Sequence, residues 1–291
     1  MVKIDHPYRS LTGGKWLRGN LHAHTTVSDG SRTPQRTIND YAKRGYDFLA
    51  ITDHDVQSTS KDYRKWDAKG LVLINGNEIS ANGPHIVHLD GSRLVEPLPI
   101  RQEALNLIND SKGMAVIAHP NWMAKFDDTT VEQLQEWIGY VGIEIFNGLI
   151  GRLKGTRYCT NKWDQLLTQG RRIWGFANDD SHSDEDVEQG WNMVYTKDRS
   201  AKAVLDALRM GRFYASTGVV INRIQVKGAT IRIETENAAR IVGVKENGRR
   251  VATVDDSGIT YQVPSGVQYV RFECWGTGES FAWTQPFFVK G

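Results

Sequence analysis

Residues 17–30, with the sequence LRGNLHAHTTVSDG, carry the strongest structural signal in the chain. The run Leu17–His22 predicts a buried strand, and His22 and His24 stand two positions apart at its end. Residues two apart in an extended chain share a face, so both imidazoles can point at one ion. Asp29 follows in a Ser-Asp-Gly loop and adds a carboxylate. This stretch therefore predicts a strand that ends in metal-ligand residues.

Further His, Asp and Glu residues lie at the ends of other predicted strands. These strands are expected at Phe48–Thr52, Leu71–Asn75, Ile86–Leu89, Ala115–Ala118, Gly142–Phe146 and Ile173–Phe176. The ligand-type residues at their ends are His54, Glu78, His85, His119, Asp180 and His182. Any one of them alone is more often a cap, a solvated charge or a core histidine. Their joint placement favours a metal site at one rim of a βα barrel.

The order of predicted elements indicates an α/β protein with two parts. Amphipathic stretches separate the strands at Pro34–Arg44, Arg101–Ser111, Val131–Ile138, Asn161–Thr168 and Ala201–Met210. Such alternation is typical of parallel βα units, and about seven of them suggest a barrel. From Val219 onward, short alternating strands separated by turns such as Asn247-Gly248 predict a small antiparallel β-sandwich. We expect two domains, residues 1–218 and 219–291.

Composition narrows the class of protein. The 291 residues include 36 Lys and Arg against 34 Asp and Glu, a net charge of +2, which gives no support to a nucleic-acid or membrane-surface partner. No apolar run approaches the ~20 residues that span a bilayer, and the first residues lack the apolar segment of a secretory signal. Only two cysteines are present, which argues against a disulfide framework or a thiolate zinc site. We expect a cytoplasmic protein with a small anionic ester substrate, and the oligomeric state stays open.

The chemical types of the candidate ligands narrow the choice of metal ion. All candidate donors are imidazoles or carboxylates, which suit Zn²⁺, Mn²⁺ or Fe²⁺. The candidates exceed the ~4–6 ligands of one ion, so two or three ions are expected. Clustered divalent ions generate hydroxide at neutral pH and neutralise the charge of an anionic ester.

The motifs together resemble the PHP family, the metal-dependent phosphoesterases named for polymerase and histidinol phosphatase domains. The matching segments are Asn20–Thr25, Ser28–Gly30, Ile51–His54, Gly76–Glu78, His85, Ala118–Pro120 and Asp180–His182. The resemblance covers about residues 15–215 and implies a distorted (β/α)7 TIM-like barrel with up to three metal ions at its C-terminal rim. The sequence departs from the family at Asn20, where Asp is frequent, and at Asp29, where many members have His.

The resemblance also implies which residues hold each ion. One ion would be held by His22, His24, Glu78 and Asp180, and Glu78 would bridge to a second ion held by His85 and His119. A third ion would be held by Asp29, His54 and His182. His85 and His88 are three apart and face opposite sides of a strand; we place His85 in the site because it occupies the family's position.

Other candidates are weaker. Asp53, Asp179 and Asn147 lie beside ligand residues and are expected to orient imidazoles through hydrogen bonds. Five basic residues are candidate contacts for a substrate anion, although each such residue is more often a solvated surface charge: Arg18, Lys125, Arg152, Arg157 and Lys162.

The expected function is hydrolysis of phosphate mono- or diesters by a metal-bound hydroxide at a di- or trinuclear site. Two alternatives remain. The same site suits a carboxyl ester or carbamate, and the C-terminal sandwich suits a carbohydrate- or protein-binding module attached to a barrel of vestigial activity. The sequence holds no Walker-type phosphate loop and no Gly-x-Ser-x-Gly motif, which argues against a serine hydrolase.

Overall fold

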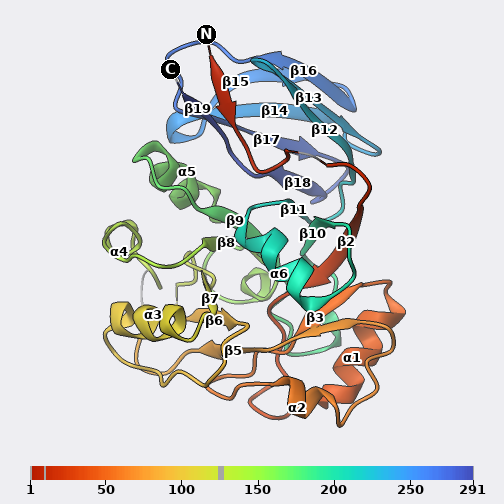
Figure 1. Cartoon of the computed structure of the whole chain (residues 1–291), viewed down its shortest axis with the longest axis vertical. Helices are drawn as coiled ribbons and strands as arrows, with labels where there is room; N and C mark the ends of the chain where they lie inside the picture. The colour runs from red at the N-terminus through yellow and green to blue at the C-terminus, as the bar shows by residue number, and fades with distance from the viewer. Residues whose placement is uncertain (1, 10, 124–127, 291) are drawn as a thin grey trace.

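Helices and strands alternate through the first two-thirds of the chain, and strands fill the last third (Figure 1). This computed structural model describes residues 2–9, 11–123 and 128–290. The helices are α1 Pro34–Lys43, α2 Ser60–Tyr63, α3 Arg101–Asp110, α4 Val131–Glu136, α5 Thr160–Thr168 and α6 Ala201–Arg209, with 3₁₀ turns η1 Leu149–Arg152, η2 Asp184–Asp186 and η3 Glu246–Gly248. The five longer helices lie where the sequence predicts them. Helix α1 begins with Pro34 as expected, and the Thr33 side chain caps it by accepting a hydrogen bond from the backbone N–H of Arg36.

The strands form three hydrogen-bonded sheets. Those of the first two-thirds are β1 Lys3–Asp5, β2 Lys15–Asn20, β3 Phe48–Ala50, β4 Val72–Ile74, β5 Gly76–Ile79, β6 Ile86–Leu89, β7 Met114–Ile117, β8 Gly142–Asn147, β9 Trp174–Asn178, β10 Trp191–Thr196 and β11 Phe213–Ser216. The remainder are β12 Ile221–Lys227, β13 Thr230–Thr235, β14 Arg240–Lys245, β15 Arg249–Val254, β16 Gly258–Gln262, β17 Tyr269–Trp275, β18 Phe281–Thr284 and β19 Phe287–Lys290. One sheet contains β2–β3–β4 in parallel, another contains β5 to β9 in order, and β12–β13–β16 form the third. The prediction of a mixed α/β fold is confirmed.

The closed barrel expected from the alternation is not observed. Among the described residues no strand pairing joins β4 to β5 or β9 to β10, and β6 runs antiparallel to both of its neighbours. Amide side chains occupy the gap between β9 and β10: Asn192 accepts from the Ala177 N–H at 3.2 Å and donates to the Ala177 carbonyl at 2.8 Å. Asn178 accepts from the Leu21 N–H at 3.1 Å. Side chains thus satisfy backbone groups that a continuous ladder would pair.

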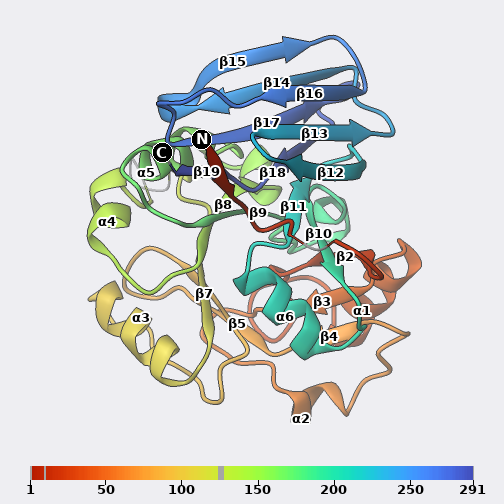
Figure 2. The same cartoon turned by 45° about the horizontal axis from the view of Figure 1, so that its top comes forward.

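The C-terminal strands share a core and also continue a sheet of the first part. Buried Ile221, Ile233 and Phe272 belong to one apolar cluster between the β12–β13–β16 sheet and the strands around β17. β18 pairs with β11, and β1 pairs with β19, so both ends of the chain lie together at the β-rich end (Figures 1 and 2). One hydrogen-bonded sheet therefore crosses residue 218, where the sequence predicts a domain boundary.

The helices of the described segments are all short. None combines the length and the apolar character that crossing a bilayer requires.

Candidate metal centre

The ligand-type segments meet because their backbones pair beyond the ends of the strands. The N–H of His24 donates to the Ser181 carbonyl at 2.9 Å, and the N–H of Asp180 donates to the His22 carbonyl at 3.0 Å. The N–H of Glu78 donates to the Asp53 carbonyl at 3.2 Å. These bonds gather segments far apart in sequence at one rim.

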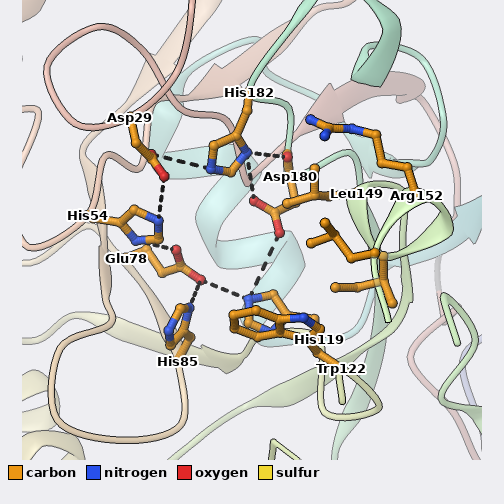
Figure 3. Close-up of a pocket in the computed structure, with 12 residues that line it drawn as sticks. Asp29, His54, Glu78, His85, His119, Trp122, Leu149, Arg152, Asp180 and His182 are labelled. Carbon is orange, nitrogen blue, oxygen red and sulfur yellow. Dashed lines mark hydrogen bonds and ion pairs between the residues drawn. The ribbon is translucent and has the colours of Figure 1, made fainter. Parts of the chain in front are cut away.

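The Glu78 carboxylate lies at the centre of the cluster. It is buried on β5, within the strand and not at its end as the sequence suggested. Five imidazole nitrogens lie within 3.4 Å of its oxygens, and they belong to His22, His24, His54, His85 and His119. Figure 3 shows three of these rings, those of His54, His85 and His119, around Glu78. A carboxylate so surrounded is placed to bridge ions.

Asp180 and His119 approach the same space from two strained positions. The φ angles of Asp180 and His119 are 54° and 25°, a region that non-glycine residues rarely occupy. The Oδ1 atom of Asp180 lies 3.2 Å from His22 Nε2 and 3.1 Å from His24 Nε2. Such backbone strain clusters at functional sites, where surrounding structure maintains it.

Asp29 closes the outer side of the cluster. Its carboxylate lies 3.3 Å from His182 Nε2 and 3.5 Å from His54 Nε2, and its side chain is 56% exposed. A cavity of about 360 Å³ opens here. Its polar lining consists of Asp29, His54, Glu78, His85, His119, Asp180 and His182.

Three overlapping groups have ligand atoms within 4.8 Å of one another: His24, Asp29, His54 and His182; His22, His24 and Asp180; and His54, Glu78 and His85. These groups contain eight of the nine residues that the sequence predicts as ligands, and the ninth, His119, has its Nε2 3.2 Å from Glu78 Oε1. The grouping differs in detail from the expected one, because His24 also joins the outer group and His54 also contacts Glu78.

Buried atoms without hydrogen-bond partners test whether ions fit. Within the described residues, such atoms include His22 Nε2, His24 Nε2, His54 Nδ1, Glu78 Oε2, His119 Nδ1 and Asp180 Oδ1. Several of these nitrogens lie close to the carboxylates, at distances such as 3.2 and 3.1 Å, without hydrogen-bond alignment. Native proteins rarely leave buried polar atoms unpaired, and converging imidazole and carboxylate donors suit divalent transition metals. The residues fit metal ions.

The charged side chains of the cluster strongly shift one another's pKa values. Burial raises the pKa of Glu78, but the charges of His22 and His85 outweigh burial and hold that pKa well below its usual range. Burial opposes protonation of His22, yet the carboxylates of Asp180, Glu78 and Glu144 raise its pKa well above its usual value. The carboxylates thus require positive charge beside them, which divalent ions supply.

Glu144 is a site residue that the sequence reasoning missed. It is buried on β8, and its carboxylate accepts four hydrogen bonds. The donors are His22 Nδ1 at 2.8 Å, the Asn178 amide at 2.9 Å, the Asn147 amide at 2.8 Å and the backbone N–H of His119 at 2.8 Å. The available signal was a lone acid inside the apolar run Gly142–Phe146, because a buried charge needs partners.

The structure shows what the other neighbouring residues contact. Asn147 donates to Asp180 Oδ2 at 3.2 Å as well as to Glu144. The Asp53 carboxylate accepts from Thr25 and Ser28. Asp179 accepts from the Tyr41 hydroxyl and from the backbone of residues 188–190. Asp53 and Asp179 thus fix loops, and within the described residues no imidazole is among these hydrogen-bond partners.

Of the described basic candidates, Arg152 lines the cavity, whereas Arg18, Arg157 and Lys162 do not. Lys162 donates to the Pro120 carbonyl at 2.6 Å. The Arg18 guanidinium stacks on Trp191 at 3.7 Å and pairs with Glu188. Arg157 pairs with Glu279, and Lys125 lies outside the described residues. Arg152 holds Asp186 through two bonds of 2.7 and 2.9 Å.

His85 and His88 lie in different surroundings. His85 Nδ1 is 3.1 Å from Glu78 Oε1 and lines the cavity (Figure 3). His88 is buried beside Asn77, with Nδ1 3.0 Å from the amide oxygen. A Cβ added at Gly91 or Gly113 would lie only 2.0 or 2.5 Å from His88 Nε2, so two glycines make room for this ring.

Comparison with known proteins gives sequence relatives over part of the chain. No family model matches. The chain is 33% identical over 95 residues to a 3',5'-nucleoside bisphosphate phosphatase of Chromobacterium violaceum, covering 32% of this chain and 33% of that protein. It is 34% identical over 90 residues to the 5'-3' exoribonuclease Rnm of Escherichia coli, covering 30% and 31%. The matches thus span about a third of these relatives' length.

A solved structure matches nearly the whole chain. It is a two-domain protein of Bacteroides vulgatus described as containing a predicted PHP-like metal-dependent phosphoesterase, with a TM-score of 0.57, 18% identity, and coverage of 99% of this chain and 97% of that one. The chain shares the fold of this PHP-like protein. The resemblance that its motifs predicted is confirmed, and its relatives bear the names of phosphoric ester hydrolases.

Proposed function

We propose that this protein is a metal-dependent phosphoesterase that cleaves phosphate mono- or diesters. The observation that carries the proposal is the convergence of imidazole and carboxylate atoms on Glu78 and Asp180, several of them buried without a hydrogen-bond partner among the described residues. An opening beside them has room for a small ester.

The ligand assignment is part of the proposal. His22, His24, Glu78 and Asp180 would hold one ion, His85 and His119 a second ion shared with Glu78, and Asp29, His54 and His182 a third. Mn, Zn and Fe suit these donors. When bound, such ions lower the pKa of water and neutralise the charge of a phosphoryl group.

The chain's own residues hold this arrangement rigid. Glu144 fixes the ring of His22 by accepting from Nδ1, which leaves Nε2 facing the cluster. Asp186 accepts from the backbone N–H groups of His182 and Ser183 and from Arg152, and so fixes the loop that carries His182. Arg152 also lines the cavity, and its guanidinium is paired with Asp186.

The test is a substrate panel with protein stripped by chelator and reloaded with Mn²⁺ or Zn²⁺. We expect hydrolysis of aryl phosphate mono- or diesters that depends on added metal, and ¹⁸O from water in the phosphate product, because no side chain is the proposed nucleophile. Faster turnover of carboxyl or carbamate esters than of every phosphate ester would refute the phosphoesterase assignment.

The panel also needs a short RNA. Two relatives are named 5'-3' exoribonucleases, whereas the net charge of +2 favours a small substrate. A 5'-phosphorylated oligonucleotide degraded faster than mononucleotides would show that the expectation of no nucleic-acid substrate is wrong.

We propose further that residues 219–291 form a supporting β-sandwich domain. A buried ion pair argues for support: Arg271 on β17 binds Asp164 on α5 at 2.6 and 2.7 Å, and the Tyr269 hydroxyl donates to the same carboxylate at 2.8 Å. α5 lies next to β8, the strand that carries Glu144 (Figure 2). The C-terminal strands thus stabilise the helix behind the site.

A further inference from the structure

The cavity has two chemically different sides. Seven of its lining residues are the ligand-type residues already described, and the other five are Trp122, Leu149, Ile150, Arg152 and Leu153. We call Trp122, Leu149, Ile150 and Leu153 the apolar lip. In Figure 3, Leu149 lies across the opening from Asp29 and His54, and Trp122 lies beside His119.

The lip is held in place by backbone bonds between two segments. Trp122 forms an antiparallel bridge with Gly155, and the N–H of Met123 donates to the Lys154 carbonyl at 2.9 Å. Gly155 permits this contact, because its φ is +130° and a Cβ there would lie 2.5 Å from the Asn121 carbonyl oxygen. The lip is therefore preformed by the chain itself, without a bound ligand.

The lip presents apolar surface right beside the ligand-type residues. The Trp122 ring packs edge-on against His119 and His85, with centroids 5.2 and 5.5 Å apart. Leu153 is 41% exposed although it lines the cavity. The charge of Arg152, the only charged side chain on this side of the described lining, is balanced by its two bonds to Asp186. Among the four lip residues only the Trp122 indole carries a hydrogen-bonding group, a single N–H donor, so a polyhydroxyl group would find no side-chain acceptor there.

We propose that the lip binds the alcohol part of the phosphate ester and that this part is apolar, an alkyl or aryl group. The inference rests on the proposed function, because the phosphoryl group must sit at the ligand-type side for its ester group to face the lip. Pockets that combine a few polar groups with a preformed apolar wall select ligands in this way.

The test measures the affinity of the metal-loaded full chain for methyl-, propyl- and butylphosphonate by calorimetry. These phosphonates are not hydrolysed, so binding is read without turnover. We expect the Kd to fall about fourfold for each added methylene, as burial of CH₂ groups predicts. Dihydroxypropylphosphonate, with the same three-carbon chain as propylphosphonate, should bind more weakly than propylphosphonate.

A substitution in the apolar lip tests whether its side chains cause the dependence of affinity on chain length. Leu153→Ser should flatten the dependence on chain length and leave the Kd of methylphosphonate unchanged. The control is Ile138→Ser, which removes a 65% exposed apolar side chain that does not line the cavity; it should bind all ligands as the parent protein does.

Two outcomes would overturn the inference, and they are distinguishable. Equal affinities along the alkyl series, or tighter binding of the dihydroxy compound, would refute the lip and leave the phosphoesterase proposal standing. Failure of every phosphonate to bind, methylphosphonate included, would refute both.

Discussion

Oε1 of Glu144 lies 2.8 Å from Nδ1 of His22, and both side chains are buried. Burial raises the pKa of Glu144, but the charge of His22 and the hydrogen bond from it outweigh burial and lower that pKa. Glu144 is therefore an anion in the interior, and it fixes the orientation of a ring whose other nitrogen faces the cluster.

We expect Glu144→Gln to weaken metal binding by about 10- to 100-fold, the usual effect of losing a carboxylate behind a ligand histidine. The reason is geometric: each Glu144 oxygen accepts two hydrogen bonds, so an amide NH₂ in place of one oxygen would face two donors. Competition with a fluorescent chelator measures the affinity. The matched control is Glu132→Gln on α4, where the side chain is exposed; equal affinities for the two variants would contradict this role.

The sequence was sufficient to predict which residues would meet. Ligand types at successive strand ends indicated one metal site at a rim, and the resemblance to the PHP family implied the nine residues that cluster. The antiparallel pairing of β6, the strand that follows His85, was not foreseen. Periodicity also placed the longer helices within one or two residues. Both features are local in sequence and so can be read from it.

The sequence was insufficient where side chains replace or support the regular structure. The open connection between β9 and β10 depends on Asn178 and Asn192, whose amides resemble ordinary strand residues until their partners are known. Glu144 gains its role from four hydrogen-bond donors at distant positions in the sequence. The strands β10 and β11 were not predicted, because their pairing joins segments that lie far apart in the chain. Residues 281–289, which read as one run of apolar and aromatic residues, form two strands, β18 and β19, separated at residues 285–286.

His85 and His88 should respond differently to removal. We expect His85→Ala to lower the bound metal and the turnover together, because His85 lies 3.1 Å from Glu78. His88→Ala should leave the metal content unchanged, since the His88 ring contacts Asn77 and does not line the cavity. Elemental analysis of both purified variants makes the comparison, and loss of metal in the His88 variant alone would reverse the assignment.

His88 should also make stability depend on pH. Burial lowers the pKa of His88 from 6.5 to about 4, so between these values the unfolded chain binds a proton that the folded chain does not. Stability is then full above pH 6.5 and falls as the pH drops toward 4, by up to about 3 kcal/mol. Urea unfolding at pH 7.5 and pH 4.5 measures the difference, which should shrink in His88→Gln; an undiminished difference would contradict the buried neutral imidazole.

The buried pair Asp164–Arg271 should contribute strongly to stability. Asp164→Asn leaves the Arg271 guanidinium buried without its counterion, which typically costs about 3–5 kcal/mol. Arg271 is 1% exposed, and Glu273 at 2.8 Å is its remaining carboxylate partner. Asp206→Asn is the control, since it breaks an exposed pair with Lys202 and should cost less than about 0.5 kcal/mol. Equal unfolding midpoints for both variants would argue against a supporting role for the C-terminal strands.

The most direct test of the metal-dependent phosphoesterase proposal is a titration of metal-free protein with Mn²⁺ or Zn²⁺. After each addition of metal, the phosphate released from an aryl phosphate is measured. The account predicts no release without metal and a rise that levels off at two or three equivalents per chain. It predicts no such rise for Asp180→Asn and a normal rise for Asp67→Asn, whose side chain is 64% exposed away from the cavity lining. Release that is independent of metal, or no release at any metal concentration, would contradict it.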